Sequence, residues 1–495
     1  MAGIKSLLKD TAIYGVSSIV GRFLNWCLVP LYTVMFAAAE YGVVTYVYSI
    51  VALALIILTY GMETGFFRFS NHDDYSDPTL VYSTSLISLA TTSTLFLALV
   101  LLFLRPIAGA LECAAHPEYI AMMAAAVAAD AFTAIPFSYL RRMRRPMRFA
   151  SLKLVGIGLN IGLNLFWILL CPKVYAVAPS LVGWCYTPGF GIGYIFLANL
   201  VSSLAMLILL IPELRGFRWR FDAVLWRRML VYSWPLLVLG VAGIMNQTID
   251  KILYPLLVAD KAEAMTGLGI YGANYKVAIV MVMFIQAFRF AYEPFIFARN
   301  KEAGDDRMQS YRDAMRYFVV FAMILFLAVM YYIDILKYFI SPRYFSGLKV
   351  VPLIMIAEFF FGVFFNLSLW YKLTDKTIWG MWFSLLGLVV TVVLNVVLVP
   401  HMGYMGCAVA ALCCYAVMMV VSWVVGHKKF PIGYNVRRLA GVFLTAMLFW
   451  GVAVAVTTDI RWLDLTVRTA LLATFVAVAM RIEHISLHNF IPSRS

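Results

Sequence analysis

Apolar residues in this chain fall in long runs, and most charged residues lie in the short stretches between them. A run of roughly 18–25 apolar residues is long enough to cross the hydrocarbon core of a membrane. Such a run must be a helix, because every backbone N–H and C=O group in lipid needs a partner within the segment. The pattern predicts an all-α, polytopic membrane protein with about fourteen transmembrane helices, at residues 11–35, 42–66, 79–104, 118–140, 152–171, 191–212, 230–257, 269–297, 315–336, 350–371, 378–399, 407–426, 439–457 and 465–480.

The composition agrees with this class. Of the 495 residues, 63% are hydrophobic and only 13% are charged. A soluble protein of this length would divide into domains whose surfaces need more charge than that. The loops between the expected helices are too short to form a soluble domain, so any chemistry must take place within or beside the membrane.

The net charge of +14 raises the question of a nucleic-acid partner, but the positions of the basic residues argue against one. Lys and Arg cluster in alternate short loops, as orientation signals do. With a cytoplasmic N-terminus, the inner side holds roughly 27 of the basic residues and the outer loops roughly seven, which fits the positive-inside rule. We therefore expect both termini in the cytoplasm, membrane lipids as neighbours and no nucleic-acid partner.

A short pattern occurs twice, six spans apart. In each copy a span ends in Pro-Leu, the next begins with Tyr-Gly, and a glutamate follows the tyrosine by 22 residues: Glu63 after Tyr41, and Glu293 after Tyr271. Coincidence among common residues is the alternative, but the matched glutamate spacing argues against it. Because an even number of spans separates the copies, they have the same orientation and form parallel repeats. The repeat predicts two six-helix lobes and an extra helix pair, at residues 1–228, 229–438 and 439–495.

Polar residues inside the first span call for an explanation, since a charge at the centre of a bilayer costs about 2.5–3.5 kcal/mol on insertion scales. Arg22 and Asn25 lie on one face of this helix, and no acidic residue stands three or four positions from Arg22. Arg22 is either a cationic group that meets an anionic ligand in a cavity, or half of a structural pair with a glutamate such as Glu63. Both interpretations stay open at this point.

The seventh span contains four polar residues in six, Asn246, Gln247, Asp250 and Lys251. A helix with so polar a stripe cannot face lipid, so we expect the stripe to face the bundle interior.

The eighth span carries Arg289 and, four residues later, Glu293, which can pair along one helix. Asp130 and Glu358 are acids in the fourth and tenth spans. Each is either a proton or sodium site or half of an ion pair, and the pattern favours the ion pair.

Several functions are not expected, because the sequence lacks the motifs that they need. The chain contains no phosphate-cradling loop, dinucleotide fingerprint or zinc-protease motif, so it is not expected to drive transport with ATP unless a partner supplies the motor. Cys113 and His116 lack a second ligand pair nearby, so no metal site is expected. Cys171 and Cys185 bracket an outer loop, where free thiols are favoured over a disulfide. Gly158 and Gly162 in the fifth span predict close helix packing.

Three stretches resemble one family. Residues 15–42 (GVSSIVGRFLNWCLVPLYTVMFAAAEYG), 60–69 (YGMETGFFRF) and 394–410 (LNVVLVPHMGYMGCAVA) are similar to segments of polysaccharide (O-antigen) flippases. These proteins belong to the multidrug/oligosaccharidyl-lipid/polysaccharide exporter superfamily. With the parallel repeat, the resemblance covers most of the chain.

The resemblance implies a transporter of the bacterial cytoplasmic (inner) membrane. Its substrate would be an oligosaccharide on a polyprenyl diphosphate, flipped to the outer leaflet by alternating access for surface polysaccharide such as the O-antigen of lipopolysaccharide. Other polysaccharide assembly proteins would be its partners, no cofactor is implied, and proton or sodium coupling stays open. The two extra spans would form a side groove for the polyprenyl tail. The implied substrate-binding residues are Arg22, Asn25, Lys251 and Arg289; the residues implied in ion coupling or structural pairing are Glu63, Asp130, Asp250, Glu293 and Glu358.

Other functions remain as alternatives. A drug or cation exporter of the same superfamily would have twelve spans and acidic, aromatic cavity residues. A lipid II flippase would have the same fold. A membrane polymerase or ligase would need a basic outer loop for diphosphate sugars, whereas the expected outer loops are poor in arginine, so the chain is not expected to be an enzyme. A structural subunit of a larger complex is the last alternative.

Overall fold

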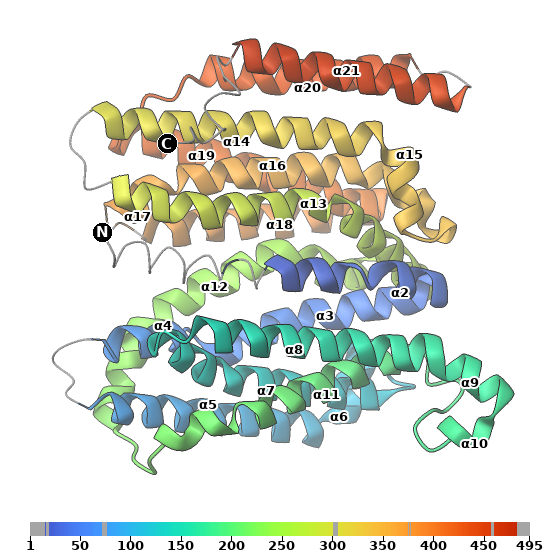
Figure 1. Ribbon diagram of the computed structural model, residues 1–495, viewed down its shortest axis with the longest axis vertical. Helices are drawn as coiled ribbons and strands as arrows, with labels where there is room; N and C mark the ends of the chain where they lie inside the picture. The colour runs from blue at the N-terminus through green and yellow to red at the C-terminus, as the bar shows by residue number, and fades with distance from the viewer. Residues whose placement is uncertain are drawn as a thin grey trace, which may run out of the picture. The chain divides into compact units, whose positions relative to one another are not determined.

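The computed structural model describes residues 15, 19–71, 77–299, 305–374, 376, 378–456 and 460–482, with the side chains of 291, 293–299, 305–307, 461 and 482 excepted. The elements that it assigns within these ranges are helices. Figure 1 shows the long helices of each part of the chain running roughly parallel to one another. This arrangement is the one expected when each helix crosses the same membrane.

The predicted transmembrane helices are confirmed. Among the described residues, twelve helices are long and apolar enough to cross a membrane. Two shorter apolar helices, Ile19–Met35 and Gly193–Leu209, match the first and sixth expected spans. Each of the fourteen ranges expected from the sequence therefore corresponds to a helix, in the same order.

The chain divides into two compact units. The first consists of residues 1–273 and 384–410. The lobes 1–228 and 229–438 and the extra pair 439–495, inferred from the repeat, are a different division and stay a prediction. The helices that lie wholly in the first unit are α2 (Val29–Met35), α3 (Ala38–Thr59), α4 (Met62–Phe69), α5 (Pro78–Leu102), α6 (Leu104–Ala110), α7 (Pro117–Arg142), α8 (Pro146–Asn164), the π-helical turn η1 (Leu165–Leu170), α9 (Cys171–Val177), α10 (Pro179–Val182), α11 (Gly193–Leu209), the 3-10 turn η2 (Ile211–Gly216) and α12 (Ala223–Leu257).

The second unit consists of residues 274–383 and 411–495. Three helices, α13 (Lys261–Arg299), α18 (Ile378–Met402) and α19 (Tyr404–Lys429), run from one unit into the other. The other helices of the second unit are α14 (Asp305–Tyr331), α15 (Ile333–Leu336), the 3-10 turns η3 (Lys337–Phe339) and η4 (Pro342–Val350), α16 (Val351–Leu367), α17 (Leu369–Leu373), α20 (Val436–Ala455) and α21 (Arg461–Ile482).

The second expected span is broken into two helices. Tyr60 and Gly61 have positive φ angles of 33° and 71°, which end α3 and start α4. Glycine adopts this conformation readily because it lacks a Cβ atom. The Gly61 carbonyl accepts backbone hydrogen bonds from Thr64 and Gly65 of α4, and a further one of 3.2 Å from the Ser233 hydroxyl of α12. The break therefore places Glu63 in the first turn of a separate helix, which hydropathy alone does not predict.

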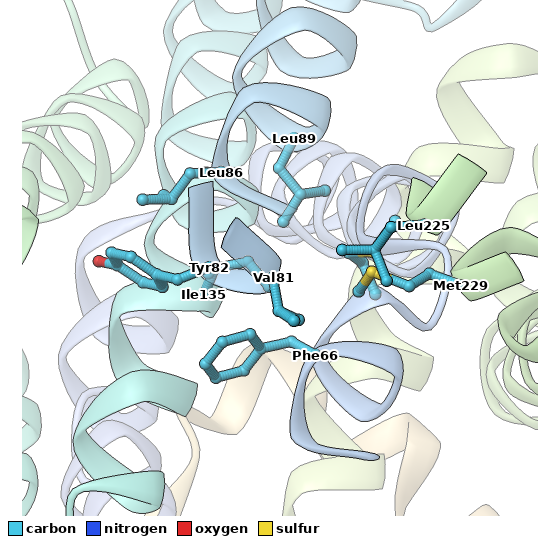
Figure 2. Close-up of a cluster of buried hydrophobic side chains, with 9 residues drawn as sticks. Phe66, Val81, Tyr82, Leu86, Leu89, Ile135, Leu225 and Met229 are labelled. Carbon is cyan, nitrogen blue, oxygen red and sulfur yellow. The ribbon is translucent and has the colours of Figure 1, made fainter. Parts of the chain in front are cut away.

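A buried apolar cluster holds α4, α5, α7 and α12 together (Figure 2). Its side chains come from helices far apart in sequence, and each is at most 2% exposed. Burying side chains of this size stabilises by about 1.5–3 kcal/mol each relative to leaving them in water. The cluster consists of Met62, Phe66, Val81, Tyr82, Leu86, Leu89, Ile135, Leu225 and Met229.

A very close backbone contact in the first unit joins the beginnings of α3 and α13. A Cβ atom added to Gly42 would lie 1.9 Å from the backbone oxygen of Met265, and one added to Gly269 would lie 1.8 Å from the backbone oxygen of Ala38. Only glycine fits at either position, because the two backbones themselves are in contact.

Close packing at Gly158 and Gly162 was the wrong prediction. Among the described residues, no atom lies within 4 Å of a Cβ atom added at either glycine. A small residue permits close packing but does not determine which helix face meets a neighbour.

Ion pairs attach the last helix, α21, to the rest of the second unit. Arg468 is 9% exposed. Its Nη1 donates to Asp334 Oδ2 and to the Tyr331 carbonyl, each at 3.1 Å, and its Nε lies 2.9 Å from Asp464 Oδ2. The hydrogen bond from Lys337, followed by that from Arg468, lowers the pKa of Asp334 below its ordinary value despite partial burial.

Replacing Arg468 with alanine is expected to lower the free energy of unfolding by about 2–4 kcal/mol, because it leaves Asp464 enclosed without its cation. Thermal unfolding of the purified protein in detergent would measure the change. Arg481→Ala is the matched control, since Arg481 is an exposed arginine on the same helix. Equal melting temperatures for the two variants would show that the ion pairs do not hold α21 in place.

Candidate functional site

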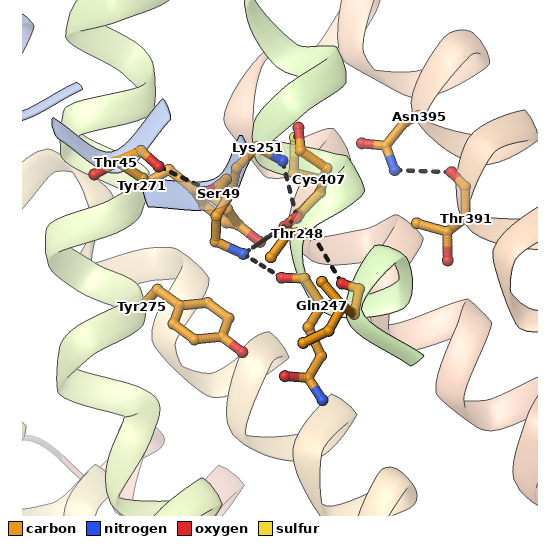
Figure 3. A network of polar contacts seen from close by, with 12 residues as sticks. Thr45, Ser49, Gln247, Thr248, Lys251, Tyr271, Tyr275, Thr391, Asn395 and Cys407 are labelled. Carbon is orange, nitrogen blue, oxygen red and sulfur yellow. Dashed lines mark hydrogen bonds and ion pairs between the residues drawn. The ribbon is translucent and has the colours of Figure 1, made fainter. Parts of the chain in front are cut away.

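A buried polar network lies in the first unit, where α12 meets the start of α13 (Figure 3). Lys251 Nζ lies 3.1 and 3.2 Å from the two carboxylate oxygens of Asp250, and it donates a 2.8 Å hydrogen bond to the Gln247 carbonyl. The Tyr271 hydroxyl donates to Asp250 Oδ2 at 2.6 Å. Asp250 and Lys251 are 4% and 8% exposed. The carboxylate is therefore satisfied from two helices, as a buried charge requires.

The polar stripe of the seventh span faces the interior at three of its four positions. Asn246, Asp250 and Lys251 are buried, and Asn246 Nδ2 donates to the Ser384 carbonyl at 3.0 Å. Gln247 is exposed, and its orientation toward the bundle interior stays a prediction. The ammonium of Lys251 is balanced by Asp250, which favours a structural ion pair. Substrate binding by Lys251 stays a prediction.

The sequence reasoning missed three members of the region around this network. Tyr271 was noted only as part of the repeat, and Thr391 and Asn395 of α18 were not singled out. Figure 3 shows the bond from Asn395 Nδ2 to the Thr391 carbonyl, which is 2.8 Å long. The side-chain oxygen of Asn395 is buried and has no hydrogen-bond partner among the described residues. A single amide or hydroxyl in an apolar span gives too weak a signal for sequence reasoning to select it.

Glu63 forms an ion pair at the start of α4. Its Oε2 accepts a 2.8 Å hydrogen bond from Arg141 Nη2 of α7 and one of 3.4 Å from the Ser138 hydroxyl. Both charged side chains are about two-fifths exposed, at 39% and 41%. An exposed pair contributes about 0–1 kcal/mol to stability. The structure thus gives Glu63 a basic partner on α7.

Asp130 on α7 lies opposite Lys153 on α8. Helices α7 and α8 pack against each other, and Lys153 is the basic residue that faces the Asp130 carboxylate. Lys153 also lies 4.0 Å above the ring centre of Phe137. The side chains of Asp130 and Lys153 are both exposed. Both interpretations of Asp130, an ion-coupling acid or half of an ion pair, stay predictions.

The other acids assigned from the sequence lie in the second unit. Glu358 on α16 is 4% exposed, and it accepts a 2.8 Å hydrogen bond from the Tyr275 hydroxyl. Glu293 belongs to α13, but its side chain lies outside the described residues. The predicted pair between Arg289 and Glu293, and the equivalence of Glu293 with Glu63, therefore stay predictions.

Three of the four assigned substrate-binding residues are accessible. Arg22 and Asn25 lie on the helix Ile19–Met35, and both side chains are exposed. Arg289 on α13 is also exposed, and its guanidinium carbon lies 4.7 Å from the ring centre of Phe365 on α16. Arginine in such positions matches the geometry of a phosphate group.

A largely apolar cavity of about 260 Å³ opens beside the two extra helices in the second unit. Helices α20 and α21 pack against α14. The cavity is lined by Trp450, Ala453 and Val454 of α20, by Arg468 of α21 and by residues of α14 and α16. The charged residues in its lining are Arg468 and Asp334. A side groove for the polyprenyl tail at the two extra helices stays a prediction.

The cysteines of the described residues form no disulfide. All seven cysteines are free, and the Cys185 thiol donates a 3.4 Å hydrogen bond to the Val182 carbonyl. Burial, aided by Glu112, raises the pKa of Cys113 to about 11, so this thiol stays protonated. His116 Nδ1 lies 2.8 Å from Glu118 Oε1. Among the described residues, no group of three His, Cys, Asp or Glu side chains could hold a metal ion.

Comparison with known proteins identifies the fold. A lipid II flippase MurJ in an inward closed conformation superimposes with a TM-score of 0.71 at 12% identity, covering 96% of this chain and 99% of MurJ. An inward-facing MATE-family multidrug resistance transporter of the MOP superfamily gives 0.66 at 12% identity, covering 83% and 94%. The MATE multidrug transporter DinF-BH gives 0.60 at 13% identity, covering 86% and 96%.

Sequence comparison adds the family. No curated protein matches the chain. A family model described as polysaccharide biosynthesis protein matches residues 7–298, more than half of the sequence. The segments that resemble the flippases at residues 15–42 and 60–69 lie inside this match. The chain is thus an integral membrane protein with the fold of the MOP exporters, and it belongs to the polysaccharide biosynthesis protein family.

Proposed function

We propose that this protein flips a polyprenyl-diphosphate-linked oligosaccharide from the cytoplasmic to the outer leaflet of the bacterial inner membrane, by alternating access. The match of residues 7–298 to a polysaccharide biosynthesis family carries the proposal. Polysaccharide biosynthesis yields the polysaccharides of the cell surface, and O-antigen is one of them. The proposal places both termini in the cytoplasm, on the side where basic loops collect.

The extent of the structural similarity favours a lipid-linked substrate over a drug. The MurJ structure accounts for 96% of this chain, whereas the two MATE transporters account for 83% and 86%. The apolar cavity beside α20 and α21 supplies a surface for a lipid tail. Exposed Arg22 and Arg289 supply cations for a diphosphate. Lipid II remains the alternative substrate, since the fold is common to both.

Ion coupling is part of the proposal. Asp250 and Glu358 are buried carboxylates that accept hydrogen bonds from Tyr271 and Tyr275, respectively. A buried acid in a membrane protein marks an ion path or a structural pair. We assign proton or sodium coupling to Glu358 and structural pairing to Asp250, which Lys251 already balances. Asp130, Glu63 and Glu293 take one or the other of these two roles.

Cells that lack the protein test the proposal. Mass spectrometry of their lipid extracts should show an accumulated polyprenyl diphosphate oligosaccharide, while the corresponding surface glycan disappears. The mass of that lipid would identify the substrate. Unchanged lipid-linked sugars and unchanged surface glycan would refute the proposal, and resistance to cationic compounds would then test the drug-exporter alternative.

Replacing Arg22 with alanine is expected to abolish transport without loss of folded protein. The side chain is exposed on its helix, so its removal leaves no cavity in the packed core, whereas a diphosphate would lose a charge-assisted hydrogen bond. Surface glycan and protein abundance in the membrane would be measured together. Wild-type glycan in this variant would rule out Arg22 as an essential ligand group.

A further inference from the structure

Two arginine-rich segments lie side by side at one end of the first unit. Residues 141–148 lead from α7 into α8, and residues 215–228 lead from η2 into α12. Helix α7 packs against η2, and an ion pair joins Arg148 of the first segment to Glu213 of η2. The arginines of the two segments therefore form one surface, the arginine patch.

The arginine patch contains ten arginines and no lysine, although the whole chain has 25 arginines and 14 lysines. An orientation signal does not distinguish the two residue types, since the positive-inside rule counts both. Arginine differs from lysine in its planar fork of N–H donors, which matches two oxygens of one phosphate group. The exclusive use of arginine therefore indicates phosphate recognition in addition to orientation.

Few carboxylates balance the arginine patch. Arg141 and Arg148 form ion pairs with glutamates, and Arg218 faces Asp77. Asp222, the one acid within the two segments, accepts hydrogen bonds from backbone N–H groups at the start of α12. Five further arginines are exposed and form no ion pair with a described residue: Arg144, Arg145, Arg215, Arg220 and Arg227.

Arg144 has a backbone conformation that usually belongs to glycine. Its φ angle is 50°, and it directly follows the end of α7, where the Arg145 N–H donates to the Leu140 carbonyl at 3.1 Å. Glycine or asparagine is the usual residue at such a helix end, because a Cβ atom is strained there. An arginine kept in a strained position points to a role for its side chain.

Exposed apolar side chains alternate with the arginines. Trp219 is 88% exposed between Arg218 and Arg220, and Met147 is 67% exposed next to Arg148. Both segments adjoin spans, so they lie at the depth of the lipid headgroups. Tryptophan is enriched at this depth, where its ring contacts the acyl boundary. A bilayer surface offers phosphates to the arginines and apolar contacts to Trp219 and Met147, whereas an acidic protein surface offers only the charge.

We infer that the arginine patch binds the phosphate headgroups of anionic phospholipids in the adjacent leaflet, which is the cytoplasmic leaflet in the predicted orientation. Anionic lipids attract basic residues close to the membrane surface. This inference concerns the membrane around the protein and does not depend on the substrate that the protein carries.

Native mass spectrometry of the purified full-length protein in detergent, with equal amounts of phosphatidylglycerol and phosphatidylcholine added, tests the patch. The wild type should bind phosphatidylglycerol preferentially. Arg144→Gln/Arg220→Gln is expected to lower this preference by about 10–30-fold, since each basic residue near a lipid surface contributes about fivefold. Arg144→Lys/Arg220→Lys should lose about threefold, because it keeps the charge but not the fork.

Lys428→Gln/Lys429→Gln is the matched control, because it removes two exposed positive charges that the predicted orientation places at the same membrane face. This variant should keep the wild-type preference. An equal loss in the control, or no loss in Arg144→Gln/Arg220→Gln, would overturn the inference. Polyglutamate should not displace phosphatidylglycerol, and displacement would assign the patch to an acidic protein instead.

Arg144→Gly separates lipid binding from a structural role. Glycine relieves the strained backbone, so this variant should melt no lower than the wild type while it loses part of the preference for phosphatidylglycerol. A lower melting temperature with an unchanged lipid preference would show that Arg144 serves the fold and would remove it from the patch.

Discussion

Adding a single methyl group at Gly42 is expected to destabilise the protein by about 3 kcal/mol, the upper end of the range for overpacked cores. The Cβ atom of alanine would lie 1.9 Å from the Met265 backbone oxygen. A flexible side chain could move away from such a contact, but a helix backbone moves only if α3 and α13 separate. Thermal unfolding of purified Gly42→Ala in detergent would measure the loss.

The structure offers both a symmetric test and a control. Gly269→Ala should be as damaging, since its Cβ atom would lie 1.8 Å from the Ala38 backbone oxygen. Gly158→Ala should instead stabilise by about 0.5–1 kcal/mol, because the glycine lies within α8 and alanine has the higher helix propensity. The double variant Gly42→Ala/Gly269→Ala should cost less than the sum, because one separation of the helices relieves both clashes.

The same contact bears on the proposed transport cycle. Met265 and Ala38 lie at the starts of α13 and α3, which the positive-inside assignment places at the outer face. Opening toward the outside would require these backbones to part. If Gly42→Ala melts like the wild type yet alters transport, the contact is already open in most molecules, and the expected loss of stability would be contradicted.

The number and order of the helices could be predicted from the sequence, because a chain segment that crosses a membrane can adopt few backbone structures. A span must be long, apolar and helical, and each expected range, such as 118–140, contains a described helix, here α7. The break at Tyr60 and Gly61 escaped prediction, since hydropathy averages carry no information on backbone dihedral angles. Local apolar length therefore predicts spans better than it predicts their interruptions.

The candidate site was predictable only where polar residues were dense. The stripe at Asn246, Asp250 and Lys251 stood out because several unfavourable residues share one helix, and the structure buries them together. The contact between Arg289 of α13 and the ring of Phe365 of α16 was not predictable, because it depends on how these two helices pack, which one sequence does not reveal.

The Asp250–Lys251 pair gives the second large prediction. Removing one partner, as in Lys251→Met, is expected to destabilise the protein by about 3–5 kcal/mol, because the remaining charge stays buried without compensation. Asp250→Asn should have a similar cost, moderated by the hydrogen bond that Tyr271 can still donate to the amide oxygen. Thermal unfolding in detergent would compare both variants with Arg141→Ala, which breaks an exposed pair and should cost less than about 1 kcal/mol.

The double variant Asp250→Asn/Lys251→Met separates a structural pair from an ion-coupling pair. Removing both charges eliminates the uncompensated one, so stability should return to within about 1–2 kcal/mol of the wild type. We expect surface glycan to return as well, because the pair is internally neutral and its two members satisfy each other. A double variant that melts like the wild type but transports nothing would contradict the structural role and assign Asp250 to ion coupling. Stability and transport must therefore be measured on the same double variant. If the pair only holds α12 in place, this variant should regain both its stability and its transport activity.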